Sequence, residues 1–288
     1  MTYEERLSAR RAEVEAALKC AVPEGIPKSV GDAMRYALLA PGKRLRPILL
    51  LEAHALLAPP DAEAMRFATA LEMMHAYSLV HDDLPAMDND VLRRGMPTCH
   101  VAYGEAMAIL AGDGLLNLAF ERMLGSRHPR ALAAAEAIAV QSGGRGMVGG
   151  QALDISHDGG TADKVLVERL QDGKTAALFR AAMGAGLILA GADSAQLAAG
   201  IAYANGMGHA FQIIDDLLDL TGDAAQLGKT PGKDQSENKL TWPAAVGAEQ
   251  AALDARRYTE DAVDALACFG EAAWFLRETA LRALNRVS

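Results

Sequence analysis

Two aspartate-rich segments are the part of this sequence with the clearest chemical potential. HDDLPAMDND begins at His81 and DDLLD begins at Asp215, and each follows a long apolar stretch. A carboxylate at the end of a buried helix is costly unless a cation lies beside it. Oxygen ligands without histidine or thiolate partners suit Mg²⁺, which takes one or two carboxylates together with substrate phosphates. The candidate metal ligands are Asp82, Asp83, Asp88, Asp215, Asp216 and Asp219.

The spacing of these aspartates indicates how they are presented. Asp215 and Asp219 are four residues apart, about 40° around an α-helix, so they share a face. Asp82 and Asp88 are six apart and diverge by about 120° on an unbroken helix, which Pro85 disfavours. If two residues of LPAM bulge out, Asp88 takes the place that Asp219 has. Either segment alone is more simply a solvated acidic helix end, but the two matched copies favour a metal site.

Basic residues complete this chemistry. GKRLRP, LRRG and DGKT are short basic segments, and a long polar stretch over residues 221–239 adds further lysines. Each cation alone resembles an ordinary surface charge. Together with two acidic clusters they indicate a pocket for phosphate esters. The glycines of GGRGMVGGQ follow a helical pattern rather than a strand, so neither a dinucleotide fingerprint nor a P-loop fits.

Composition limits the class of protein. The chain has 288 residues, 51% of them apolar, and a net charge of -9, which argues against a nucleic-acid partner. Its three cysteines have no metal-type spacing, which predicts reduced thiols and a cytoplasmic location. The amphipathic N-terminal segment is no signal peptide, and polar residues interrupt the least charged stretch, so we expect no membrane span.

Helical periodicity dominates the chain, no run alternates as a strand does, and no linker divides it. We therefore predict one all-α domain over residues 1–288. The apolar segment 64–80 should be surrounded by other helices. Further helices are predicted over 3–20, 28–39, 46–57, 99–124, 129–150, 162–190, 194–220 and 241–286, the last broken near Gly270. Loops over 40–47 and 221–239 separate them, and the longer is a candidate lid or a disordered segment.

Several of these segments together resemble one known family, the trans-type short-chain prenyl diphosphate synthases, in particular the bacterial farnesyl diphosphate synthases. They are GKRLRP, HAYSLVHDDLPAMDND, LRRGMPTCH, GGQALD, GKT, FQIIDDLLD, LGKTPGKD and NKLTW. The resemblance implies an all-α bundle of ten or more helices around a deep central cavity, a homodimer, and three Mg²⁺ ions when substrate is bound. It also implies condensation of isopentenyl diphosphate with dimethylallyl diphosphate and then with geranyl diphosphate.

The same resemblance assigns roles to residues. It implies that Asp82, Asp88 and Asp215 hold the magnesium ions, with Asp83, Asp216 and Asp219 in support. The residues implied to bind the allylic diphosphate are Arg93, Lys174, Lys229 and Lys239, and those implied to bind isopentenyl diphosphate are Lys43, Arg46, His75 and Arg94. Thr175 and Gln212 are expected along the developing allylic cation. Gln151 and Asp154 either assist near the metals or form a buried hydrogen-bonding pair, and His81, His100 and His209 have no assigned role.

Product length should depend on cavity depth. Tyr77 and Met74 precede Asp82 by five and eight residues, which places them roughly 7 and 12 Å below the metals on a helix. Bulky side chains there form a floor that predicts a C15 product, with C10 or C20 as the alternatives. Asn89 stands where the bacterial pattern usually has an aspartate. A terpene cyclase is disfavoured by DDLLD, and a non-catalytic subunit by the retained aspartates and cations.

Overall fold

The chain folds into a helical bundle, and the computed structural model describes residues 1–157, 160, 162–221 and 239–285. The first half contains α1 (Tyr3–Lys19), α2 (Lys28–Leu38), α3 (Leu45–Ala55), α4 (Ala62–Asp82), α5 (Cys99–Tyr103), α6 (Glu105–Leu124) and α7 (Ala131–Ser142). The second half contains α8 (Met147–Ser156), α9 (Lys164–Gln171), a π-helical turn η1 (Asp172–Ala176), α10 (Ala177–Ala190), α11 (Ser194–Thr221), α14 (Trp242–Val246), α15 (Ala248–Ala265), a 3₁₀ segment η2 (Leu266–Ala273) and α16 (Trp274–Leu284). The predicted all-α class is confirmed.

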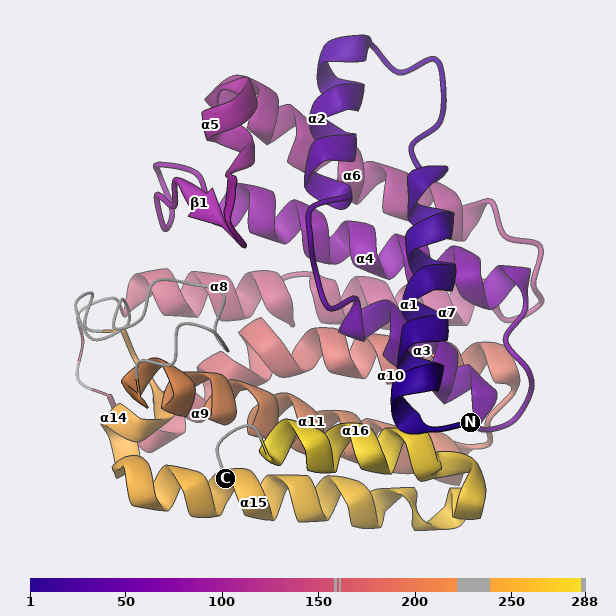
Figure 1. Cartoon of the computed structure of the whole chain (residues 1–288), viewed down its shortest axis with the longest axis vertical. Coiled ribbons are helices and arrows are strands. Elements are labelled where there is room, and N and C mark those ends of the chain that lie inside the picture. The colour runs from indigo at the N-terminus through magenta and orange to yellow at the C-terminus, as the bar shows by residue number, and fades with distance from the viewer. Residues whose placement is uncertain (158–159, 161, 222–238, 286–288) are drawn as a thin grey trace.

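The long helices form the body of the bundle. In Figure 1, α4, α10, α11 and α15 run in nearly the same direction, and α1 and α2 cross them. Helix α4 packs against α6, α3, α2 and α10, as predicted for the apolar segment 64–80. Helix α10 is buried along most of its length, and Gly186 lets it approach α3 closely. A Cβ atom on Gly186 would lie 2.3 Å from the Leu50 carbonyl oxygen, so a larger residue would push these helices apart.

Breaks between helices account for the main errors in the predicted helix boundaries. The single helix predicted over 99–124 is wrong, because Gly104 at φ +86° separates α5 from α6. The helix predicted over 129–150 is also wrong, since α7 ends at Ser142 and α8 begins at Met147. The break near Gly270 is confirmed, and a second one occurs at Gly247. Glycine adopts positive φ without the steric cost that a Cβ atom adds, so these chain directions are available to it.

A short β-hairpin follows α4, where the sequence predicts no strand. Its strands are β1 (Leu92–Arg93) and β2 (Met96–Pro97), paired antiparallel. Arg94 and Gly95 form the turn with φ of +53° and +79°, as a two-residue hairpin turn with a right-handed twist requires. Strands of two residues are too short to show alternation, which is why the pattern misses them. The hairpin fixes the backbone that carries both arginines of LRRG.

A buried arginine fixes the loop between α2 and α3. Arg44 has φ +51° and is 4% exposed. Its guanidinium donates to Glu15 at 2.6 Å, to Glu72 at 2.9 Å and to the Ala40 carbonyl at 2.7 Å. Removing one partner from such a buried ionic cluster is far more costly than losing a surface ion pair. Arg44 is therefore a structural residue that fixes Lys43, in the loop, and Arg46, in the first turn of α3.

Candidate active site

The first aspartate segment leaves the α-helix with a bulge of two residues. Helix α4 ends at Asp82, and the Asp88 N–H donates to the Asp82 carbonyl at 2.9 Å. In an α-helix that carbonyl accepts from the residue four positions on. Asp88 therefore makes the backbone hydrogen bond that the residue four positions after Asp82 would make in an α-helix. The two extra residues between them confirm the predicted bulge in LPAM.

The Asp82 carboxylate lies among groups from α8 and η1. Gln151 donates to Asp82 Oδ1 at 2.5 Å, and Lys174 Nζ lies 2.6 Å from Asp154 Oδ2. Burial lowers the pKa of Lys174, but the carboxylates of Asp82, Asp154 and Asp88 outweigh it and raise that pKa overall. Lys174 is therefore charged and close to the first aspartate segment. The alternative in which Gln151 and Asp154 form a hydrogen-bonding pair is wrong. Gln151 bonds to Asp82, and Asp154 bonds to Lys174.

The remaining groups of the first segment are also paired with cations. Arg93 donates to Asp83 from Nε at 2.7 Å and from Nη2 at 2.5 Å, and Asp83 is 3% exposed. Lys239 Nζ lies 3.6 Å from Asp88 Oδ2. Asp83 thus orients an arginine predicted to bind substrate. Three predicted diphosphate ligands, Arg93, Lys174 and Lys239, converge on this aspartate segment.

In the second segment, Asp216 accepts hydrogen bonds from Gln171, Gln212 and Trp242 within the described part of the chain. Gln212 Nε2 donates to Oδ1 at 2.8 Å, whereas Gln171 Nε2 and the Trp242 backbone N–H donate to Oδ2 at 3.1 and 3.0 Å. Gln212 in turn accepts from the Thr175 hydroxyl at 2.8 Å. Asp216 therefore joins α11 to the π-turn and to the start of α14. Its predicted contact with a metal remains a prediction.

Two chains of contacts connect the aspartate segments, which are far apart in sequence. One runs from Asp82 through Lys174 to its neighbour Thr175, and then through Gln212 to Asp216. The other runs from Asp88 to Lys239, three residues before Trp242, whose N–H binds Asp216. In Figure 1 the hairpin after α4 and the short helix α14 lie at the same side of the bundle. The two segments therefore belong to one site.

The predicted isopentenyl diphosphate ligands form a second basic group. Arg46 Nη1 lies 3.5 Å from His75 Nε2, and its guanidinium stacks 5.4 Å from the Phe179 ring centre. Burial lowers the pKa of Arg46 to about 10, and burial with the nearby Arg46 and Arg94 holds the pKa of His75 well below its usual range. The Arg46 Nε atom is buried without a protein hydrogen-bond partner among the described residues. Arg46 is thus a buried cation beside a second arginine, and a bound anion would stabilise it.

The other residues of this group lie close by. The Arg94 guanidinium donates to the Pro41 carbonyl at 2.7 Å, which brings the hairpin turn against the GKRLRP loop. Lys43 is on the same loop and is exposed. A cavity of about 50 Å³ lies beside them, and His75, Asp83, Arg93 and Arg94 are among its lining residues. The loop, the hairpin and α4 thus gather these cations next to the first aspartate segment. Lys229 lies outside the described residues, as does almost all of the candidate lid.

The residues predicted as the cavity floor are both on α4. Met74 is fully buried, and Tyr77 is 7% exposed. The Tyr77 ring meets the edge of His81 with ring centres 5.9 Å apart. His81 packs against Gly112 of α6 and contacts the Ile109 carbonyl at 3.1 Å, so it fills space between helices, as expected of a residue with no assigned role. Tyr77 therefore packs against His81 one turn further along α4, and His81 in turn contacts α6.

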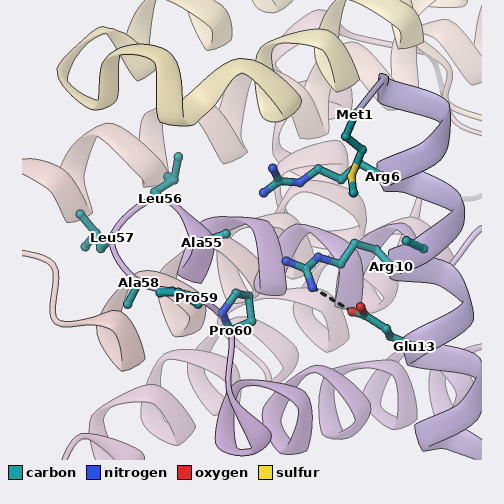
Figure 2. A pocket seen from close by; sticks show the side chains of 11 residues that line it. Met1, Arg6, Arg10, Glu13, Ala55, Leu56, Leu57, Ala58, Pro59 and Pro60 are labelled. Atoms are coloured by element: carbon teal, nitrogen blue, oxygen red, sulfur yellow. Dashed lines mark hydrogen bonds and ion pairs between the residues drawn. The ribbon is translucent and has the colours of Figure 1, made fainter.

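A larger hollow on the molecule is unrelated to this site. It measures about 480 Å³ and lies between α1 and the loop that follows α3 (Figure 2). Arg6 and Arg10 line it, but they pair with carboxylates: Arg6 with Glu52 at 2.6 Å and Arg10 with Glu13 at 2.8 Å. This hollow therefore lacks the unbalanced positive charge that a diphosphate needs, and none of the predicted site residues lines it.

Sequence reasoning missed several residues that build the site. Gln171 and Trp242 hold Asp216, and Arg180 donates to Asp172 in the π-turn at 2.6 Å. Gln171 directly precedes DGKT and Trp242 is the last residue of NKLTW, so both lie within or next to segments that resemble the family. Arg180 has no such signal, because a single arginine in an apolar helix is equally consistent with an exposed position.

The donor set fits a hard divalent ion shared with a substrate. Among the described residues, no three His, Cys, Asp or Glu side chains lie close enough to hold an ion without other ligands. Mg²⁺ does not need such a cage, because it accepts one or two carboxylates and completes its shell with phosphate oxygens and water. Burial raises the pKa of Asp82, Lys174 opposes that rise and Asp88 adds to it, so the carboxylate benefits from a cation. Asp82 and Asp88 on one side and Asp215 and Asp219 on the other can supply these ligands.

Known proteins share this fold and these segments. The polyprenyl synthetase family model matches residues 27–267. The chain is 44% identical over 262 residues to farnesyl diphosphate synthase of Escherichia coli, covering 88% of this chain and 87% of that protein. It is 43% identical to a heterodimeric geranylgeranyl pyrophosphate synthase large subunit of Arabidopsis thaliana, covering 90% of this chain and 70% of that protein. The crystal structure of an FPP/GFPP synthase from Zymomonas mobilis matches with a TM-score of 0.87 at 36% identity, covering 98% of each chain.

The helical bundle with two joined aspartate segments and converging cations defines a prenyltransferase of the isoprenoid synthase type. This chain belongs to the polyprenyl synthetase family. Members named farnesyl and geranylgeranyl diphosphate synthases match it at similar identity, so the comparisons do not fix the length of its product.

Within the part of the chain that the structure describes, none of the helices combines the length and the apolar character needed to cross a bilayer.

Proposed function

We propose that this chain condenses isopentenyl diphosphate with dimethylallyl diphosphate and then with geranyl diphosphate, to give (2E,6E)-farnesyl diphosphate with Mg²⁺ as cofactor. The observation that carries the proposal is the grouping of its cations. Arg93, Lys174 and Lys239 gather at the first aspartate segment. Arg46 and His75 lie together with Arg94 near them, forming a second basic group. One site with two anion-binding groups fits an enzyme that joins two diphosphate esters.

The protein side chains have defined tasks in this reaction. Breaking the allylic carbon–oxygen bond leaves negative charge on pyrophosphate, and positioned cations stabilise that charge. Bound Mg²⁺ supplies further charge neutralisation at the leaving group. Asp83 binds the Nε and Nη2 edge of Arg93, so we expect Nη1 to be the atom that binds the diphosphate. Lys174 is charged because three carboxylates surround it, so it can bind the departing pyrophosphate.

Thr175 and Gln212 can stabilise the allylic carbon as positive charge develops on it. The Thr175 hydroxyl donates its proton to Gln212 Oε1, so its lone pairs face elsewhere. Gln212 is itself held by Asp216, and this fixes the direction of both dipoles. Preorganised dipoles stabilise charge without reorganising during the reaction. The buried apolar residues of α10 and α4 provide walls that keep water away from a reactive cation.

The experiment that tests the function is an assay of the purified chain with Mg²⁺, isopentenyl diphosphate and dimethylallyl diphosphate, followed by dephosphorylation and identification of the prenyl alcohols. We expect farnesol as the main product. Geraniol or geranylgeraniol alone would favour the C10 or C20 alternatives within the same family. A cyclic hydrocarbon would favour a terpene cyclase, and absence of turnover would favour a non-catalytic partner subunit.

Tyr77→Ala tests the C15 product assignment. Tyr77 is 7% exposed on α4, so truncating its ring should deepen the cavity below the aspartates. We expect the main product to lengthen from C15 to C20 or longer, measured by chromatography of the alcohols. Thr69→Ala, two turns further from Asp82 on the same helix and fully buried, is the control that should retain the C15 product. If Tyr77→Ala still stops at C15, the floor lies elsewhere.

We further propose that the chain is a homodimer and lies in the cytoplasm. Apolar side chains on the consecutive helices α5 and α6 remain exposed, among them Val101 at 50%, Ile109 at 45% and Leu110 at 52%. An exposed apolar surface of this kind is typical of a protein interface. Leu110→Glu should convert a dimer into a monomer in light scattering, whereas Leu132→Glu on α7 should not.

All three cysteines are free thiols, which supports the proposed cytoplasmic location.

A further inference from the structure

The π-helical turn η1 carries two residues of the proposed reaction. Lys174 reaches Asp154 and the first aspartate segment, and its neighbour Thr175 reaches Gln212 on α11. Adjacent residues of an α-helix point about 100° apart, since one turn takes 3.6 residues. A π-turn is wider, and such turns are rare and frequent at functional sites. The departure from α-helical geometry thus occurs at the residues that must both face the site.

Close backbone packing holds this turn from one side. A Cβ atom on Gly173 would lie 2.7 Å from Gly150 Cα, and one on Gly150 would lie 2.1 Å from the Lys174 nitrogen. The π-turn and α8 therefore touch through two glycines. This contact leaves no room for the turn to shift toward α8, but it does not prevent a shift in the opposite direction.

Arg180 on α10 holds the turn from the other side. Its Nη1 donates to Asp172 Oδ1 at 2.6 Å, and its Nη2 donates to Asp172 Oδ2 at 3.2 Å and to the Asp172 carbonyl at 3.0 Å. The same guanidinium donates to Gln141 on α7 at 2.9 Å and to Asn205 on α11 at 3.0 Å. One side chain thus fixes the first residue of the π-turn to two neighbouring helices.

The charges around this contact favour the arrangement. His209 Nε2 lies 3.8 Å from Asp172 Oδ1, and its ring stacks on Tyr258 with ring centres 4.9 Å apart. Hydrogen bonding with His209, together with Arg180, lowers the pKa of Asp172 to about 2. A planar guanidinium that binds a carboxylate with two nitrogens gives a fixed orientation, which a lysine ammonium does not.

We propose that Arg180 is a positioning residue for the prenyl transfer reaction, acting through Asp172 to hold the π-turn so that Lys174 and Thr175 both face the substrate. This inference rests on the proposed function. Arg180 bonds to Gln141, Asp172 and Asn205 rather than to the aspartate segments, so its effect on the reaction is indirect. A displacement of about 1 Å in positioned groups can lower turnover on the order of 10²-fold.

The test compares Arg180→Gln with the wild-type enzyme in the prenyl transfer assay. We expect kcat to fall on the order of 10- to 100-fold, while KM for isopentenyl diphosphate stays within about twofold, because Arg46 and His75 lie on other helices. Arg180→Lys should recover little, since it cannot bond the Asp172 carboxylate and carbonyl together. Arg10→Gln is the matched control: Arg10 is also a partly buried, carboxylate-bound arginine, but it lies on α1.

A double-mutant cycle separates positioning from general destabilisation. If Arg180 acts through Thr175, the effects of Arg180→Gln and Thr175→Ala are not independent. The fold loss of kcat in the double variant should then be smaller than the product of the fold losses in the two single variants. Hydrogen exchange should also increase at the amides of 172–177 in Arg180→Gln and not in Arg10→Gln. Independent effects on kcat, or wild-type turnover in Arg180→Gln, would overturn the proposal. If Arg180→Gln does not fold, Asp172→Asn provides the same cycle from the other partner.

Failure of this proposal can be told apart from failure of the proposed function. If the wild-type chain forms no prenyl product, the proposed function is wrong, and hydrogen exchange alone then decides whether Arg180 holds the π-turn. If the wild type is active and Arg180→Gln is equally active, only the positioning role is wrong.

Discussion

Asp82→Ala should lower kcat/KM by a factor on the order of 10²–10³. This result is expected because Asp82 lies at the meeting point of α4, α8 and η1, where Gln151 and Lys174 surround its carboxylate. Loss of one group that preorganises charge stabilisation in an active site has an effect of this size. The Mg²⁺ concentration for half-maximal activity should rise as well, because one ligand is missing. Both quantities are measured in the steady-state prenyl transfer assay.

Asp113→Ala is the control for Asp82→Ala. Asp113 is also an aspartate on a helix, 3.8 Å from His81 Nε2, but its side chain is 63% exposed and takes no part in the contacts described between the two segments. We expect unchanged turnover and an unchanged Mg²⁺ requirement. Full activity in Asp82→Ala, with the same Mg²⁺ dependence as the wild type, would contradict the assignment of the aspartate segments as the metal site.

Asp216→Ala should lower the free energy of unfolding by roughly 3–5 kcal/mol. Asp216 is 5% exposed and accepts from Gln171, Gln212 and the Trp242 N–H, so its loss leaves three donors without their acceptor. A buried donor without a partner costs about 1–3 kcal/mol, and the separate costs are not fully additive. Urea denaturation measures the change. Trp242 fluorescence in a Trp274→Phe background reports whether the start of α14 is displaced.

Asp216→Asn distinguishes two roles of this residue. The amide keeps one acceptor for Gln212 but presents an NH₂ group where Gln171 and Trp242 donate. If Asp216 acts by positioning, this variant loses stability and turnover while its Mg²⁺ requirement stays unchanged. Asp215→Asn is the comparison variant, and it should raise the Mg²⁺ requirement. An equal rise in both variants would make Asp216 a metal ligand, as the family resemblance implied.

Much of the site is visible in the sequence because its chemistry is local. A few neighbouring residues are enough to recognise the spaced aspartates, the proline in LPAM and the basic segments. The bulge between Asp82 and Asp88 follows from such local reasoning, and the Asp82 carbonyl hydrogen bond confirms it. The long helices follow likewise from hydrophobic period and composition, since both act over one or two helical turns.

The tertiary structure alone decided how the candidate residues divide their tasks. Arg93 binds the Asp83 carboxylate, and Gln171, Gln212 and the Trp242 N–H bind the Asp216 carboxylate. In the sequence, neither aspartate can be told apart from the aspartate that directly precedes it. Arg180 and the π-turn have no sequence signal, because their roles depend on which distant backbone and side chains approach them. Hydrogen bonds are short and directional, so a partner from another helix is determined only when the helices pack. The sequence by itself therefore determined which groups are available for this chemistry, and packing determined which of them come together in one site.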